Sequence, residues 1–344
     1  MRSSLCSLLA AVAFTVASSA FAQSTPNPAL LVLSKTDRTL AIVDPASLNA
    51  VARIPVGNDP HEVVASSDGK TAYVSNYGFG AYHTLAVVDL VAREPLPAID
   101  LGALHGPHGL VFRDGKVWFT AEAARSIGSY DPSTGKIDWV MGIGQNRTHM
   151  LYVFPGAQRI LTTNVNSGTV TILEKYDLKP AETMPGVPRG GILPPGGDWL
   201  LTVIPVGSRD EGFDVLPDGK EAWVANAGDG TISIIDIASK RVTATLAANV
   251  PGANRLKFTP DGKLVLVSAG PNAVIFDAAT RKEIKRLPIG HGSGGILVQP
   301  DGTRAFVACS PDNYVAVIDL KTLSVVGHID AGGNPDGMAW AVRQ

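Results

Sequence analysis

The sequence predicts an all-β fold: a single seven-bladed β-propeller whose blades each contain four antiparallel strands. Three observations support this prediction. One motif recurs with a period that suits a propeller blade, four short strands can be counted in most repeats, and the two ends of the chain hold complementary parts of one blade. Many tight turns are expected as well, because the 344 residues include 36 glycines and 24 prolines and only 17% of them are charged.

The recurring motif is an Asp-Gly turn followed by a strand. It reads SDGKTAYVSN at 67–76, RDGKVWFTAE at 113–122, PDGKEAWVAN at 217–226, PDGKLVLVSA at 260–269 and PDGTRAFVAC at 300–309. Asp-Gly favours a tight turn, and the apolar residues behind it have the spacing of a strand. A second strand, often ending in aspartate, then a third strand, a Gly/Pro loop and one more short strand complete the repeat.

Seven of these short strands can be counted, which gives the number of blades. They begin near residues 62, 109, 150, 212, 255, 295 and 337. When the first 22 of the 344 residues are set aside as a leader, each repeat has about 46 residues, the size of a four-stranded blade. The C-terminal PDGMAWAV lacks partners, and the N-terminal ALLVLSK, TLAIVDP and AVARIPV lack an inner strand. We therefore expect these segments to pair and to close the ring.

One region fits the repeat poorly. Residues 175–210 are longer than one connection between strands requires. We interpret about 175–198 as an insertion and the following TVIPVG as an outer strand, because it matches ARIPVG of the first repeat. A ring of eight blades is the less favoured alternative.

Residues 1–22 have the pattern of a secretory signal peptide. Arg2 supplies a positive start, an apolar stretch runs from Leu8 to Val16, and Ala20-Phe21-Ala22 fits the small-residue rule for cleavage. The apolar stretch is too short to span a membrane. We therefore expect residues 23–344 to form an exported domain, periplasmic or secreted, without a membrane span after cleavage.

The charge of the chain argues against a nucleic-acid partner. Lys and Arg total 29 and Asp and Glu total 31, which gives a net charge of −2. No run of basic residues provides the clustered charge that displaces counterions from a phosphate backbone.

Histidine recurs at one structural position, the residue just before each inner strand at one mouth of the central channel. In chain order this position holds His61, His108, His149, Glu211, Asn254, Gly294 and Asp336. Three imidazoles and a carboxylate from successive blades suit a divalent metal ion such as zinc, manganese, copper, iron or nickel. We predict His61, His108, His149 and Glu211 as metal ligands. The alternative is a polar lining whose rings stay too far apart to share an ion.

Charged residues beside this position are candidates for ligand binding. Arg147 and Arg209 lie in the preceding loops and could bind a carboxylate through two hydrogen bonds. Glu62 and Arg255 directly follow the mouth position, where most repeats have glycine. For Glu62 and Arg255 the alternative is a structural ion pair.

Aromatic and histidine side chains in nearby loops extend the candidate site. Tyr77, Phe79, Tyr82 and His83 belong to the Gly-rich segment NYGFGAYHT and could wall a ligand pocket, or they could pack on the neighbouring blade. His105 and His291 lie in loops that lead to inner strands, and they are the candidates for an acid or base in catalysis.

The repeats resemble a known family. AYVSN, AWVANAGDGTISIIDIASKRV and AFVACSPDNYVAVIDLKTLSVVGHIDAGGNPDG are similar to the YVTN-type β-propeller repeat of secreted and surface-layer proteins. This resemblance covers nearly all of the chain after the leader and implies a propeller and an exported location. It implies little about function, because propellers host many activities. The repeat around 146–210 departs most from the pattern, with FPGAQ in place of the Asp-Gly turn.

Three functions are compatible with these patterns. The first is an exported module that binds a small ligand or a divalent metal ion at the channel mouth. The second is a metal-dependent lyase or lactonase-like enzyme with the same site, since histidines at the mouth resemble the arrangement of streptogramin lyases. That resemblance implies a metal that stabilises enolate-like charge while a histidine moves a proton. The third is a scaffold for a protein or cell-wall partner without chemistry, and the sequence leaves the choice open.

Overall fold

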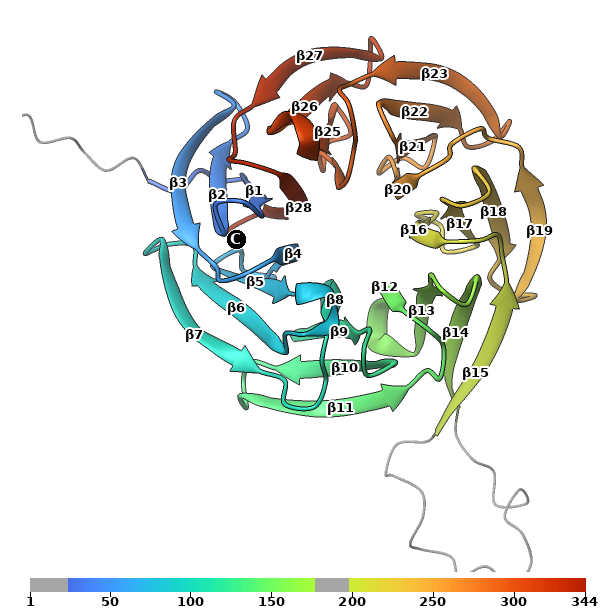
Figure 1. Ribbon diagram of the computed structural model, residues 1–344, viewed down its shortest axis with the longest axis horizontal. Helices are drawn as coiled ribbons and strands as arrows, with labels where there is room; N and C mark the ends of the chain where they lie inside the picture. The colour runs from blue at the N-terminus through green and yellow to red at the C-terminus, as the bar shows by residue number, and fades with distance from the viewer. Residues whose placement is uncertain (1–23, 177–197) are drawn as a thin grey trace, which may run out of the picture.

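The computed structural model describes residues 24–176 and 198–344. Seven four-stranded antiparallel sheets stand in a ring around a central channel (Figure 1). The predicted seven-bladed β-propeller is confirmed, and the eight-bladed alternative is wrong. Helix in the described ranges is limited to the short 3-10 turns Gly78–Gly80, Pro155–Ala157 and Ser310–Asp312, and no helix there is long and apolar enough to cross a membrane. The predicted signal peptide, residues 1–22, lies outside the described residues.

Each blade runs from the channel to the rim in four strands. The inner strands are β4 (Pro60–Ala65), β8 (Pro107–Arg113), β12 (Thr148–Val153), β16 (Asp210–Val215), β20 (Ala253–Phe258), β24 (Ile296–Val298) and β28 (Pro335–Ala341). The second strands are β1 (Ala29–Ser34), β5 (Thr71–Asn76), β9 (Lys116–Ala121), β13 (Arg159–Asn164), β17 (Glu221–Asn226), β21 (Leu264–Ala269) and β25 (Arg304–Cys309).

The third and outer strands complete the blades. The third strands are β2 (Thr39–Asp44), β6 (Thr84–Asp89), β10 (Ser126–Asp131), β14 (Thr169–Tyr176), β18 (Thr231–Asp236), β22 (Asn272–Asp277) and β26 (Tyr314–Asp319). The outer strands are β3 (Asn49–Pro55), β7 (Glu94–Asp100), β11 (Lys136–Gly142), β15 (Asp198–Pro205), β19 (Arg241–Leu246), β23 (Lys282–Pro288) and β27 (Ser324–Ile329).

The ring closes as the chain ends predicted. Strand β28 at the C-terminus pairs antiparallel with β1 near the N-terminus, with Leu30 opposite Trp340 and Val32 opposite Met338. The sheet order β28-β1-β2-β3 thus joins the last ten residues to the first repeat. Both edges that would otherwise be unpaired at the channel are satisfied by this pairing.

The predicted insertion falls almost entirely on residues 177–197, which lie outside the described residues. The strands that flank it pair with each other, with Tyr176 of β14 opposite Asp198 of β15. The segment TVIPVG contributes to β15, the outer strand of its blade, as predicted.

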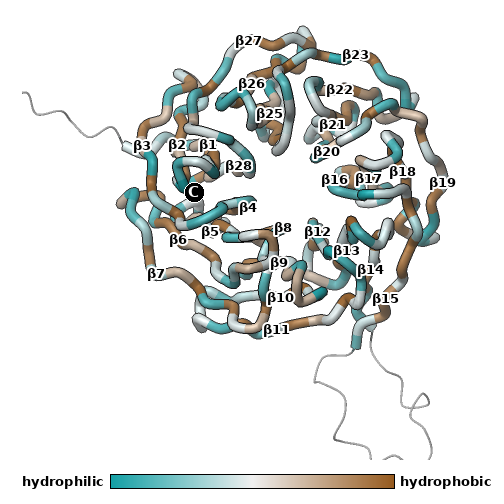
Figure 2. Tube along the Cα trace, viewed as in Figure 1, coloured by the Kyte–Doolittle hydropathy of each residue, from teal (hydrophilic) through white to brown (hydrophobic). Residues whose placement is uncertain are grey.

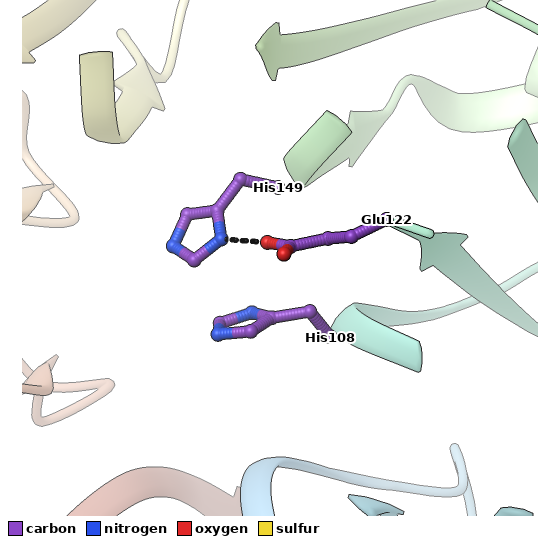
Figure 3. Close-up of side chains that lie close together, drawn as sticks. All are labelled: His108, Glu122 and His149. Carbon is purple, nitrogen blue, oxygen red and sulfur yellow. Dashed lines mark hydrogen bonds and ion pairs between the residues drawn. The ribbon is translucent and has the colours of Figure 1, made fainter. Parts of the chain in front are cut away.

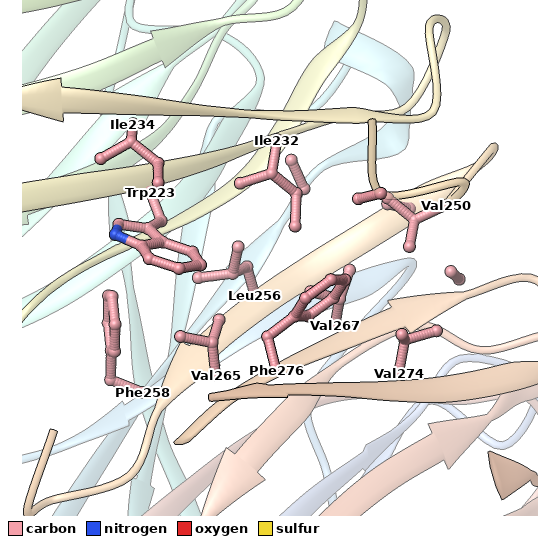
Figure 4. Packing of buried hydrophobic residues seen from close by; sticks show 14 residues of the cluster. Trp223, Ile232, Ile234, Val250, Leu256, Phe258, Val265, Val267, Val274 and Phe276 are labelled. Carbon is pink, nitrogen blue, oxygen red and sulfur yellow. The ribbon is translucent and has the colours of Figure 1, made fainter. Parts of the chain in front are cut away.

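The hydrophobic core lies mainly between blades, because the middle strands are covered on both faces by their neighbours. One cluster joins the blades of β17 and β21, and it includes Trp223, Leu256, Phe258 and Phe276 (Figure 4). Figure 2 shows hydrophobic segments within the blades and hydrophilic segments where β4, β12 and β16 face the channel. Packing of the apolar middle strands therefore stabilises the ring. The polar residues of the inner strands, which face the channel, are not needed for this packing and can form a site.

Most inner strands contain one extra residue at the channel mouth. In β8, for example, three residue steps from Pro107 to Leu110 oppose two steps on β9, from Ala121 to Phe119. The same irregularity occurs at the start of β4, β12, β16, β20 and β28. A bulge of this kind re-aims the side chains it contains. The predicted mouth position lies inside the bulge in each of these strands.

Hydroxyl groups on the second strands fix the backbone of the mouth histidines. Ser75 accepts a hydrogen bond from the backbone N–H of Glu62 (3.0 Å) and donates to the carbonyl of His108 in the next blade (2.9 Å). Thr120 accepts in the same way from Gly109 (2.8 Å) and donates to the carbonyl of His149 (2.8 Å). Neighbouring inner strands are thereby tied together at the residues that carry the imidazoles.

Candidate functional site

The structure brings the three mouth histidines together. The ring centroids of His61 and His108 are 4.8 Å apart, and those of His108 and His149 are 3.9 Å apart. All three side chains are buried, as is Glu211, the carboxylate at the same position of the next blade. The inner strands β4, β8, β12 and β16 supply these groups from four successive blades.

His108, Glu122 and His149 form the one group in the described residues whose potential metal-ligating atoms lie close together, all within 4.8 Å of one another. We call these three residues the His-Glu-His cluster. Figure 3 shows the two imidazole rings one above the other with the Glu122 carboxylate beside them. All three side chains are buried, so the cluster is shielded from bulk solvent.

Glu122 was not singled out in the sequence, although a signal for it exists. It is the residue directly after the second strand of its blade, and the same position holds Lys35 after β1 and Tyr77 after β5. In the remaining blades this position holds Val165, Ala227, Gly270 and Ser310. Aligning the repeats at this position, as well as at the mouth position, would have revealed a second set of polar groups from three successive blades.

The Glu122 carboxylate is the centre of the cluster. One oxygen accepts a short hydrogen bond from His149 Nδ1, and the other accepts a hydrogen bond from the Tyr77 hydroxyl at 2.5 Å. Arg147 Nε lies 3.4 Å from Glu122 Oε2, and Arg147 Nη1 lies 3.3 Å from Glu211 Oε1. Arg147 therefore joins the two glutamates, while Tyr77 and His149 hold the Glu122 side chain in place.

His149 lies between two carboxylates. Its Nδ1 bonds to Glu122, and its Nε2 lies 3.0 Å from Glu211 Oε2 at an angle that does not make a hydrogen bond. Burial lowers the pKa of His149, but the two carboxylates outweigh burial and raise this pKa above its usual value. Burial likewise raises the pKa of Glu211, yet His149 and Arg147 lower it to about 2. The two carboxylates on either side of the His149 ring therefore favour its protonated form.

The pKa of His108 is shifted in the opposite direction from that of His149. Its pKa is far below the usual value, because burial and the positive charge of His149 both disfavour its protonation. Its Nδ1 atom is buried and has no hydrogen-bond partner among the described residues. A buried polar nitrogen without a partner costs free energy, and such an atom calls for a specific explanation.

His61 is held by a separate group of charges. Lys35 Nζ lies 2.7 Å from His61 Nε2 and 3.0 Å from Asp336 Oδ2, and Asp59 Oδ1 is 3.7 Å from the same ammonium. Because an ammonium group can only donate, the Nε2 lone pair of His61 is occupied by Lys35. Of the four predicted metal ligands, the structure places His108 and His149 in the cluster, Glu211 against His149, and His61 against Lys35.

Replacing Lys35 with methionine is expected to raise the pKa of His61. Burial lowers this pKa, and the positive charge of Lys35 lowers it further, whereas the negative charges of Asp336 and Asp59 raise it. Removing the Lys35 ammonium therefore strengthens the net effect of the two aspartates on the pKa of His61. An NMR titration of the His61 ring measures the change, and Lys35→Arg, which keeps the charge, is the control. An unchanged His61 pKa in Lys35→Met would contradict the assigned contact.

Glu62 and Arg255 form an ion pair across the channel. Arg255 Nη2 donates a short hydrogen bond to Glu62 Oε1, although β4 and β20 lie on opposite sides of the ring (Figure 1). The guanidinium also donates to the carbonyl of Asn254 at 3.0 Å. The Arg255 side chain is buried and that of Glu62 is nearly so, so this pair is largely shielded from bulk solvent. The structural ion pair considered from the sequence is therefore present.

The remaining predicted residues lie at the edge of the mouth or away from it. Arg209 is 64% exposed and reaches within 3.8 Å of Glu211. Tyr82 is exposed, and His83 pairs with Asp100 at 2.8 Å.

The two acid or base candidates lie apart from the cluster. His105 packs against the His83 ring at 4.9 Å. His291 is 88% exposed and bonds to Asp312 at 2.5 Å. In the parts of the chain that the structure describes, neither imidazole bonds to the His-Glu-His cluster.

Comparisons with known proteins extend to the fold alone. No protein-family model and no curated protein matches the sequence. A protein of unknown function from Desulfotomaculum acetoxidans has 16% identity and a TM-score of 0.73, with 93% of this chain and 100% of that chain covered. Hydrazine synthase from Kuenenia stuttgartiensis has 16% identity and a TM-score of 0.68, with coverages of 89% and 99%.

A third solved structure has a description that names an activity. It comes from Bacteroides uniformis and is described as a proposed 6-phosphogluconolactonase; it has 15% identity, a TM-score of 0.71 and coverages of 91% and 99%. At these identities the likeness supports the propeller architecture and transfers no residue role. The fold and the cluster define a seven-bladed β-propeller with a buried His-Glu-His group that could hold a metal ion.

Proposed function

We propose that this protein is an exported metal-binding β-propeller that holds one divalent transition-metal ion at the channel mouth. The observation that carries the proposal is the convergence of His108, Glu122 and His149 within 4.8 Å in a buried setting. Two imidazole nitrogens and one carboxylate oxygen are a ligand set that suits Zn²⁺, and other first-row metals of similar preference compete for it.

The residues present fit such an ion. The buried Nδ1 of His108 lacks a hydrogen-bond partner among the described residues, and a metal would use its lone pair. Glu211 reaches His149 from the side opposite Glu122 and offers a second carboxylate. Tyr77 and Arg147 contact the Glu122 carboxylate from outside, and contacts of this kind orient a ligand and tune its basicity.

A bound ion would act as a Lewis acid with a position left for water or a small ligand. The protein's own residues supply the setting for it. Hydroxyl groups of Ser75 and Thr120 fix the backbone that carries both imidazoles, and the Glu62–Arg255 pair links the inner strands β4 and β20.

A Zn²⁺ titration of protein without a histidine tag tests the proposal. We expect calorimetry to give one equivalent of bound Zn²⁺ and an increased melting temperature, because the ion binds only the folded chain. His108→Asn is expected to weaken binding by at least about 100-fold, since a nitrogen ligand is lost. His291→Asn is the matched control, because that imidazole is exposed. Absence of stoichiometric binding, or equal losses in both variants, would refute the metal site.

The affinity for Zn²⁺ is expected to fall as the pH falls. The ion must displace the proton that His149 shares with the carboxylates, and the pKa of His149 lies above its usual 6.5. Below that pKa the apparent affinity should drop by about tenfold per pH unit, because each binding event then releases a proton. Calorimetry at several pH values, in buffers of different ionisation enthalpy, measures both the apparent affinity and the number of protons released on binding. An affinity that stays constant between about pH 5 and pH 8, the range in which histidine titrates, would contradict this assignment.

A further inference from the structure

A cavity of about 390 Å³ opens directly beside the His-Glu-His cluster. Its lining includes Tyr77, Phe79, Glu122, Arg125 and Arg147. Glu122 belongs to the cluster, and Tyr77 and Arg147 both contact its carboxylate, so the cavity reaches the edge of the proposed metal site. Its volume falls within the range of cavities that hold small organic ligands.

Phe79 gives this polar cavity an apolar wall. The side chain is 88% exposed, and the residue has a left-handed backbone with φ of 50° between two glycines. That conformation is uncommon for a bulky residue, and it persists only where the surroundings hold it. Here Asp59 accepts a hydrogen bond from the backbone N–H of Gly78 at 2.8 Å, and the Tyr77 ring lies 5.7 Å from the Phe79 ring.

Opposite charges face each other at the mouth. The cationic side chains are Lys35, Arg147, Arg209 and Arg255, and the anionic side chains are Asp59, Glu62, Glu122, Glu211 and Asp336. A divalent ion held by the His-Glu-His cluster would add positive charge beside the cavity. Arg125, on the cavity wall, adds a guanidinium that has no ion-pair partner among the described residues.

We propose that this cavity binds an organic carboxylate when the metal site is loaded. The carboxylate group meets Arg125 and Arg147 beside the metal, and the apolar part of the molecule lies against Phe79. A guanidinium binds a carboxylate through directed, charge-assisted hydrogen bonds, and two guanidinium groups lie on this cavity wall. This inference rests on the proposed function, because the bound ion would add positive charge beside the cavity.

A second cavity competes for the same kind of ligand. It lies at the same loop, has a volume of about 470 Å³, and is lined by Lys35, Arg38, Asp59 and Phe79 among others. Lys35 and Asp59 are already engaged with His61 and with each other. Arg38 is therefore the residue that separates the two cavities experimentally, because it lines only the second.

Calorimetric titration with benzoate tests the inference, with Zn²⁺ binding measured first on the same sample. We expect benzoate to bind the Zn²⁺-loaded protein at least about tenfold more tightly than the metal-free protein, and more tightly than neutral benzamide or phenyl phosphate. Arg125→Gln should weaken benzoate binding by about threefold to tenfold, and Arg38→Gln should leave it unchanged. Phe79→Ala should weaken benzoate binding and leave acetate binding unchanged.

The outcomes separate the two proposals. If Zn²⁺ binds but benzoate does not, or if Arg38→Gln weakens benzoate binding while Arg125→Gln does not, the carboxylate cavity is refuted and the metal site stands. Tighter binding of phenyl phosphate than of benzoate would also overturn the assignment to a carboxylate. If Zn²⁺ itself fails to bind, the proposed function is refuted and this inference with it.

Discussion

Replacing Glu122 with glutamine is expected to lower the affinity for Zn²⁺ by about 100- to 1,000-fold, because the change removes a charged ligand and the partner that orients His149. The side chain keeps its size and can still bond to the Tyr77 hydroxyl, so the ring should remain folded. Calorimetry gives the affinity, and the melting temperature of the metal-free variant verifies the fold.

Glu174→Gln is the matched control for this experiment. Glu174 also carries two cationic partners, Arg159 and Lys240, but it lies at the end of β14 on the far side of its blade from the cluster. We expect its replacement to leave Zn²⁺ binding unchanged. Equal losses of affinity in both variants would mean that lost charge, and not a lost ligand, explains the effect.

Deleting residues 335–344 is expected to abolish cooperative folding. The deletion removes β28, so β1 loses its partner strand and the packing of Met338, Trp340 and Ala341 is lost. Each large apolar side chain that leaves the core costs about 1.5–3 kcal/mol, and the free edge of β1 favours aggregation. The free energy of unfolding of a domain is only about 5–15 kcal/mol, so the loss of several such side chains is expected to unfold it.

Thermal unfolding followed by circular dichroism tests this expectation. Deletion of Gln344 alone is the control, because Arg343 is the last residue tied to the N-terminal segment, through Thr25 and Asn27. A cooperative transition at an unchanged temperature in the longer deletion would contradict the role of β28 in closing the ring.

The fold was predictable because its information is periodic. The same turn and strand pattern occurs five times, and the two ends of the chain supply the missing parts of one blade. Periodicity also predicted that His61, His108 and His149 share one mouth, because equivalent residues of a ring must face its axis. The strand register therefore determines which residues share the mouth.

The detailed pairing at the mouth was not predictable in the same way. Glu122 and Lys35 come from the ends of second strands, and their reach towards the mouth depends on the distance between neighbouring blades. The positions of His105 and His291 were also not predictable. Both residues lie in loops that lead to inner strands, yet the His291 side chain is exposed to solvent. A sequence gives the blade on which a residue lies, but the direction of a loop side chain depends on packing.

The Glu62–Arg255 contact links two opposite walls of the ring. Because the Arg255 guanidinium and the Glu62 carboxylate meet across the channel, a solute that moves along the axis at that height encounters their ion pair. We therefore expect this pair to oppose passage between the two faces of the ring, whereas a ligand at the mouth can enter and leave from its own side.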